Sequence, residues 1–199
     1  MKTIFLSIVS FLSISVLAQN NLENDLNKAL NSSEKSNLVE LVKNYPNEWL
    51  PKYYLALSEV VSVLEKDNKN DNSKMLDEAK SLINKLENQD PKNVEILNLK
   101  ALYLTAEIVQ DPLTNGGIYY PDVLETYQKA LRLNPNNPRS VLGLAEFNIN
   151  AANYIGTDIT QDCKNVKKSL ALFTNEKPKK NEPKWGKERA EELLKNQCK

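Results

Sequence analysis

Turn-forming prolines recur at a nearly constant interval along this chain, and this repeat constrains the fold more than any other sequence feature. Pro46, Pro91 and Pro135 each lie in a short polar turn, 45 and then 44 residues apart, and Pro178 follows 43 residues later. An internal period of roughly 20 to 50 residues is typical of an array of similar structural units. We therefore expect each interval to fold as one such unit.

The segments around these prolines share a helical register. An alanine follows each of the first three prolines by ten residues, at Ala56, Ala101 and Ala145. Before Pro135, apolar residues four and three apart lie on one face of a helix: Val123, Tyr127 and Ala130. Only five of the 199 residues are glycine, which also favours helices. The pattern predicts pairs of helices with a small residue where the two helices meet.

The order of Val123, Tyr127, Ala130 and Pro135, with Ala145 ten residues later, resembles the core signature of a tetratricopeptide repeat. The resemblance covers roughly residues 34 to 178 and implies an all-α fold, a right-handed solenoid of antiparallel helical hairpins, with a C-terminal capping helix. The family repeat has about 34 residues, so the longer periods here require extra residues. We place these at 66–73, 111–120 and 154–160.

The sequence predicts the following helices and domains. The helices are expected near residues 21–31, 34–44, 48–65, 74–88, 93–110, 121–133, 137–153, 162–174 and 184–198. The predicted domains are a signal peptide (1–18), an N-terminal helical hairpin (19–45), three TPR-like helix pairs (46–178), and a linker with the capping helix (179–199).

The first eighteen residues have the pattern of a secretory signal. Lys2 precedes an apolar run that ends at Ala18, which predicts cleavage before Gln19. A membrane anchor is the alternative, but a span needs about 20 strongly apolar residues and this run contains four serines. We therefore expect a secreted or periplasmic protein without stable membrane insertion after cleavage.

Composition argues against several functional classes. Without Lys2 the mature chain has 25 basic and 26 acidic residues, so it has no net field that would attract nucleic acid. The chain has no histidine, which removes the commonest general base and the commonest zinc ligand. Carboxylates alone can catalyse hydrolysis, but Glu107 and Asp111 are more simply interpreted as a solvated helix end. We expect no enzyme, no metal site and no cofactor.

The two cysteines, Cys163 and Cys198, are predicted to form a disulfide. Export places them in an oxidising compartment, where two cysteines tend to pair. Antiparallel helices over 162–174 and 184–198 would bring both to the same end of the helix pair. The alternative is a small buried Cys163 and an exposed Cys198.

The resemblance implies a binding groove. In the family, the first helix of each pair lines a concave groove that receives a peptide or a segment of a partner protein. Carried over to this sequence, the groove residues are Tyr53, Leu57, Glu95, Asn98, Leu102, Arg139, Glu146 and Asn150. For Tyr53 and Leu57, burial under the N-terminal helices is the alternative.

A second candidate site is the segment 111–120, interpreted as a loop. Gly116 and Gly117 permit unusual backbone angles, and Tyr119 and Tyr120 could anchor a ligand. The alternative is that the tyrosines pack on the neighbouring helices. A third segment, Lys177–Arg189, has six basic and two acidic residues and is either a solvated linker or a patch for an acidic partner.

These observations favour an exported, non-catalytic protein-interaction or scaffolding module that binds a peptide or protein segment. The alternative is a small-molecule or glycan-binding helical-repeat protein of the cell envelope.

Overall fold

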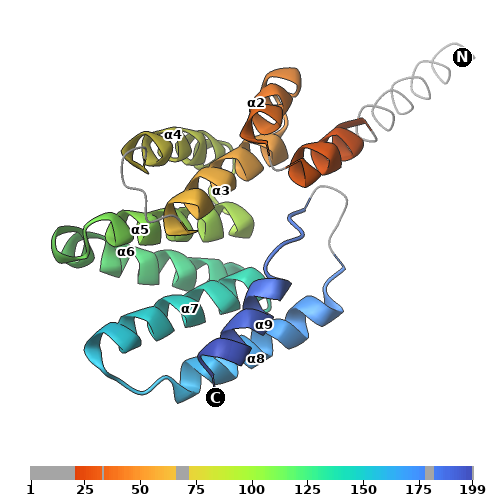
Figure 1. Ribbon diagram of the computed structural model, residues 1–199. Helices are drawn as coiled ribbons and strands as arrows, with labels where there is room; N and C mark the ends of the chain where they lie inside the picture. Colours follow the sequence, from red (N-terminus) through yellow and green to blue (C-terminus); the bar gives the residue numbers. More distant parts are fainter. Residues whose placement is uncertain (1–20, 33, 66–71, 178–181, 199) are drawn as a thin grey trace, which may run out of the picture. The chain divides into compact units, whose positions relative to one another are not determined.

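The computed structural model describes residues 21–32, 34–65, 72–177 and 182–198, and every regular element within these ranges is an α-helix (Figure 1). Residues 21–31 form a helix. The labelled helices are α2 (Lys35–Asn44), α3 (Trp49–Glu65), α4 (Asn72–Gln89), α5 (Val94–Gln110), α6 (Pro112–Leu133), α7 (Pro138–Ile155), α8 (Thr160–Asn175) and α9 (Lys187–Asn196). The all-α prediction is confirmed for these residues. The signal peptide (1–18) and most of segment 66–73 lie outside them, and the solenoid stays a prediction.

The chain divides into two compact units, Met1–Leu55 and Ala56–Lys199. The boundary falls inside α3, so it differs from the expected domain division, which stays a prediction. In the first unit, the helix over 21–31 and α2 bury leucines such as Leu26 and Leu41. The Tyr45 hydroxyl donates a hydrogen bond to Asp25 over 2.8 Å and ties the end of α2 to that helix.

In the second unit, consecutive helices run antiparallel (Figure 1). Lys100 of α5 pairs with Glu87 of α4 over 2.8 Å. Asn148 of α7 donates to Asp162 of α8 over 3.0 Å. Only Asp111 separates α5 from α6, so these two helices form a tight hairpin.

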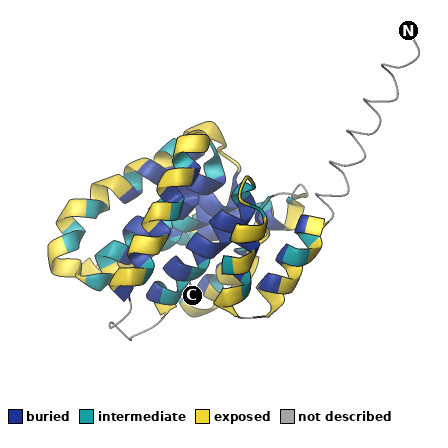
Figure 2. Cartoon of the chain, turned by 90° about the horizontal axis from the view of Figure 1, so that it is seen from above, coloured by how far each residue is buried: buried dark blue, intermediate teal, exposed yellow. Residues whose placement is uncertain are grey.

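Small residues lie where helices approach closely. Ala56, Ala101 and Ala145 are buried, as the repeat register predicts, and burial concentrates on the inward faces of the helices (Figure 2). Gly143 of α7 shows the same requirement, because a Cβ there would lie 2.5 Å from the hydroxyl oxygen of Tyr127 on α6.

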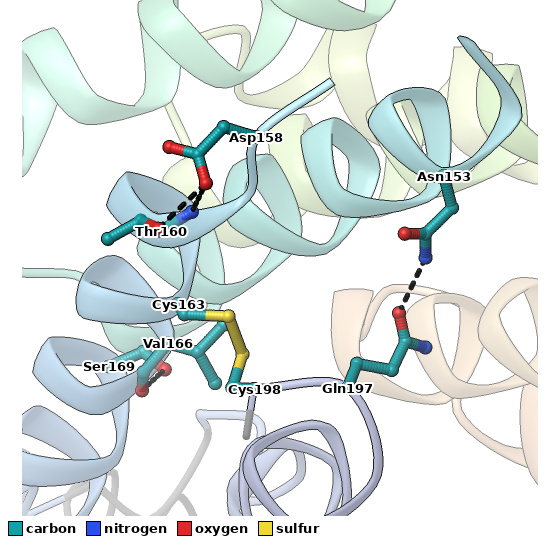
Figure 3. The surroundings of a disulfide bond; sticks show 8 residues. All are labelled: Asn153, Asp158, Thr160, Cys163, Val166, Ser169, Gln197 and Cys198. Atoms are coloured by element: carbon teal, nitrogen blue, oxygen red, sulfur yellow. Dashed lines mark hydrogen bonds between the residues drawn. A yellow bond between two sulfur atoms is a disulfide. The ribbon is translucent and has the colours of Figure 1, made fainter. Parts of the chain in front are cut away.

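The last two helices close the unit over a shared apolar core. Val166 and Phe173 of α8 and Leu193 of α9 are buried with residues of α7. A disulfide joins Cys163 at the start of α8 to Cys198 just after α9, with an S–S distance of 2.04 Å and a Cα–Cα distance of 5.5 Å (Figure 3). The two cysteines thus lie at the same end of the helix pair.

The buried alanines generate the first stability prediction. Replacing Ala101 with leucine should overpack the core and lower the free energy of unfolding by about 1–3 kcal/mol. The control is Ala171→Leu on the exposed side of α8, which should change it by about 0.5 kcal/mol or less. Urea unfolding measures both, and equal effects of the two variants would show that the repeat register is wrong.

The second stability prediction concerns the disulfide between Cys163 and Cys198. Its loop spans 35 residues, for which chain entropy predicts about 4 kcal/mol of stabilisation. Cys163→Ser together with Cys198→Ser should lose this stabilisation, and reductant should destabilise the natural protein but not the variant. Two thiols that can be alkylated in the unreduced natural protein would contradict the pairing.

Candidate functional site

The residues expected to line the groove are mostly buried in the structure. Tyr53, Leu57, Glu95, Asn98 and Arg139 are all buried. Leu102 is half-buried, and only Asn150 is exposed. Glu146, half-buried, accepts a hydrogen bond over 2.7 Å from Arg189 of α9. The groove prediction is therefore wrong for the buried residues, because neighbouring chain covers them and the polar ones bond to each other.

Arg139 lies at the centre of this buried polar group. Its Nε donates to Glu95 over 2.7 Å, and its Nη2 pairs with Glu176 just after α8. Nη1 donates to the backbone oxygen of Trp185 over 3.2 Å, and the guanidinium carbon lies 5.7 Å from the centroid of the Phe173 ring. Burial opposes the charge, but the two carboxylates outweigh it and raise the pKa of Arg139 above its ordinary value.

Amide side chains extend the group toward the starts of α5 and α7. Asn137, the N-cap of α7, donates to Glu95 over 2.6 Å and accepts from Ser140 N–H over 2.8 Å. Asn98 donates to Asn137 over 3.1 Å and accepts from the Ser140 hydroxyl over 2.7 Å. We call the whole set the Arg139 cluster: Glu95, Asn98, Asn137, Arg139, Ser140 and Glu176.

A polar pocket of about 430 Å³ lies beside the Arg139 cluster. Its wall includes Asn93, Asn134, Asn175 and Glu182. Asn93 caps α5 by accepting from the N–H groups of Glu95 and Ile96, and Asn134 and Asn175 bond to nearby backbone. Asn93, Asn134 and Asn175 thus have hydrogen-bond partners inside the fold, which hold the wall of the pocket in place.

Residues 112–120 are helical, which corrects the loop prediction for Tyr119 and Tyr120. Asp111 caps α6 by accepting from Thr114 N–H over 3.2 Å, and Pro112 occupies the first turn, where its missing N–H costs nothing. Gly116 and Gly117 are not among the glycines with positive φ. Pro121 lies inside α6. The helix therefore continues through Gly116, Gly117 and Pro121, although glycine and proline usually disfavour helices.

With α6 extended, one of its helical rows faces α7. Leu113, Tyr120, Leu124 and Tyr127 follow at intervals of seven, four and three residues, which places them on one side of the helix. Tyr127 is fully buried against Gly143 of α7. The row becomes more exposed toward the start of α6: Tyr120 is 40% exposed and Leu113 is 88% exposed.

The matching row of α7 shows the same gradient. Gly143, Phe147, Asn150 and Tyr154 lie on the side that faces α6. The Phe147 ring lies 5.1 Å from the Tyr120 ring, centroid to centroid, whereas Tyr154 is 76% exposed. The cause is visible in Figure 1, where α6 and α7 converge at the turn that joins them and diverge toward the start of α6 and the end of α7.

We call the residues at the diverging ends the α6–α7 patch: Leu113, Tyr120, Phe147, Asn150 and Tyr154. Asn150 and Tyr120 were predicted as binding residues, though in different sites. Leu113 was missed because the row on α6 is recognisable only when the helix is read through Pro121. Phe147 and Tyr154, on α7, were missed as well.

The described ranges show no cluster of three or more Asp, Glu, Cys or His side chains placed to hold a metal ion. Glu107 accepts a hydrogen bond from the Tyr103 hydroxyl, and Asp111 is a helix cap. None of the described helices has the length and apolar character needed to cross a bilayer.

The Arg139 cluster generates a third prediction. Arg139→Met should lower the free energy of unfolding by about 3–5 kcal/mol, because it leaves the carboxylates of Glu95 and Glu176 without their counter-charge. Arg132→Met, at an exposed position of α6, is the matched control and should cost about 0.5 kcal/mol or less. Similar urea midpoints for both variants would show that the cluster does not hold the unit together.

Comparison with known proteins adds one finding. No protein-family model matches the chain, and no curated protein matches it in sequence. Among solved structures, the HusA haemophore from Porphyromonas gingivalis is similar, with a TM-score of 0.72 over 88% of this chain and 90% of that chain, at 20% sequence identity. At this identity the likeness shows that the two proteins share a helical fold.

Proposed function

We propose that the protein is an exported, non-catalytic binding protein that holds a flat, largely apolar small molecule of the haem type on the α6–α7 patch. The observation that carries the proposal is the exposure of aromatic and aliphatic side chains on the facing rows of two diverging helices. The proposal favours the small-molecule alternative over a peptide groove, since most of the groove residues are buried.

The chemistry of the patch suits such a ligand. Leu113 and Tyr154 stand largely exposed on opposite helices, so a planar ligand between them would cover apolar surface from both sides. The tilted Tyr120 and Phe147 rings would form the base, and Asn150 would supply a polar contact. Ligand sites of this kind combine apolar and aromatic walls with a few polar groups.

The likeness to a haemophore supports the ligand class, because a haemophore is by name a carrier of haem and shares this fold. The chain has no histidine, and both cysteines are in the disulfide. The oxygen of Tyr154 is therefore the iron ligand that the exposed part of the patch could offer, and tyrosine does serve as a haem ligand in some proteins. Contacts with the ring face would bind an iron-free porphyrin as well.

The test is a titration of the mature protein with haemin and with iron-free protoporphyrin, followed by absorbance and tryptophan quenching. Leu113→Ala should weaken binding by roughly ten- to fiftyfold, because it removes three carbon atoms whose burial is worth up to about 0.8 kcal/mol each. Tyr154→Ala should weaken binding at least as much. Tyr154→Phe separates the roles of the ring and the oxygen: it should affect haemin alone.

The matched control is Ile118→Ala. Ile118 is 57% exposed on the same helix but lies on the side that faces away from α7. Its replacement should leave both affinities unchanged, and all four variants should melt like the natural protein because the side chains are outside the core. No binding of either porphyrin, or equal losses for Leu113→Ala and Ile118→Ala, would contradict the proposed site.

A further inference from the structure

The nearly neutral net charge of the chain hides a strong segregation of charge. Residues 163–199 contain eleven basic and five acidic residues, whereas residues 19–162 contain fourteen basic and twenty-one acidic ones. The end of the chain is therefore positive while the remainder is negative. Such asymmetry is typical of a protein with one surface for an anionic partner.

In the described structure, part of this positive charge forms a row on α8. Lys167 and Lys168 follow Lys164 by three and four residues, and all three are exposed, so they share one side of the helix. The opposite side carries Val166 and Phe173 into the core. Asp162 is the one acidic residue of α8, and it lies on the side toward α7, where it accepts from Asn148. The lysine row thus has no carboxylate of its own helix beside it.

An exposed aliphatic side chain lies at the adjoining corner. Ile155, the last residue of α7, is 69% exposed. It follows Asn148 by seven residues, which places it on the side of α7 toward α8. The connection to α8 is short. Within it, hydrogen bonds from Thr160 lower the pKa of Asp158 most, and the charge of Lys164 lowers it further.

We propose that the lysine row and Ile155 form a docking surface for an anionic phospholipid bilayer. Lysine is a compact charge that binds phosphate groups without a fixed geometry, and basic residues near an anionic leaflet add their attraction together. An exposed apolar side chain beside them can enter the headgroup region. The row has no arginine or aromatic residue, the residue types that dominate protein–protein contacts, so a lipid surface fits it better than a protein partner.

The test is flotation of the mature protein with vesicles of phosphatidylcholine alone, or with about one-third phosphatidylglycerol. Binding is expected with the anionic vesicles only, and about 0.5 M salt should weaken it at least tenfold, because screening shortens the reach of the lysine charges. Free inorganic phosphate at low concentration should not compete, which separates a bilayer from a site for a single anion.

Charge reversal then locates the surface. Lys164→Glu, Lys167→Glu and Lys168→Glu combined should weaken vesicle binding by roughly tenfold or more. The matched control reverses three exposed lysines of α4, Lys74, Lys80 and Lys85. It changes the net charge equally and should leave binding within about threefold, because these lysines lie outside the proposed face.

Ile155→Ser should weaken binding several-fold without changing its salt dependence. Porphyrin binding should be the same in all these variants, so failure of this proposal is distinct from failure of the proposed function. No binding to anionic vesicles, or equal losses for the two lysine triples, would overturn the docking surface. The exposed lysines can be reversed without touching the core, and matching thermal melts would verify this.

Discussion

The buried charge of Arg139 is the constraint on which the second unit depends. A buried guanidinium is tolerated only when it is paired and hydrogen-bonded, and here its partners come from α5, from the residue after α8 and from the backbone before α9. Satisfying one charge therefore fixes the starts of α5 and α7 side by side and holds the segment that leads into α9. The disulfide secures the opposite end of α8 and α9, so the last helix is fastened at both ends.

Much of the fold follows from the sequence because the period is a property of packing. The spacing of apolar residues and turn prolines can be read directly from the sequence. This spacing determines where the helices lie, which alanines are buried and where the two cysteines are placed. The Arg139 cluster follows the same period. Glu95 and Arg139 are 44 residues apart, and each follows its turn proline by four residues. Glu95 and Arg139 hold the same place in successive proline-to-proline intervals, lie side by side, and carry opposite charges. A family-based assignment of groove residues overlooked that pairing.

The candidate site was harder to predict because its exposure arises from how two helices diverge. Gly116, Gly117 and Pro121 are local signals against a helix, yet α6 continues through them because Asp111 caps it and its apolar face packs on α5 and α7. Sequence periodicity identifies which residues share a row. It does not tell how far along that row the neighbouring helix stays in contact, and that length decides whether Tyr120 and Leu113 are core residues or part of an exposed patch.

Net charge does not report how charge is distributed over a surface. Attraction at a bilayer depends on charges within about a Debye length, near 10 Å, and not on the sum over the chain. The lysine row and Ile155 lie beside the end of α7 that also carries Tyr154 of the α6–α7 patch. Docking through α8 would thus bring the patch close to the lipid surface. A flat apolar ligand is itself concentrated in a bilayer by the hydrophobic effect, so the two proposed surfaces together would let the protein exchange such a ligand where it is most abundant.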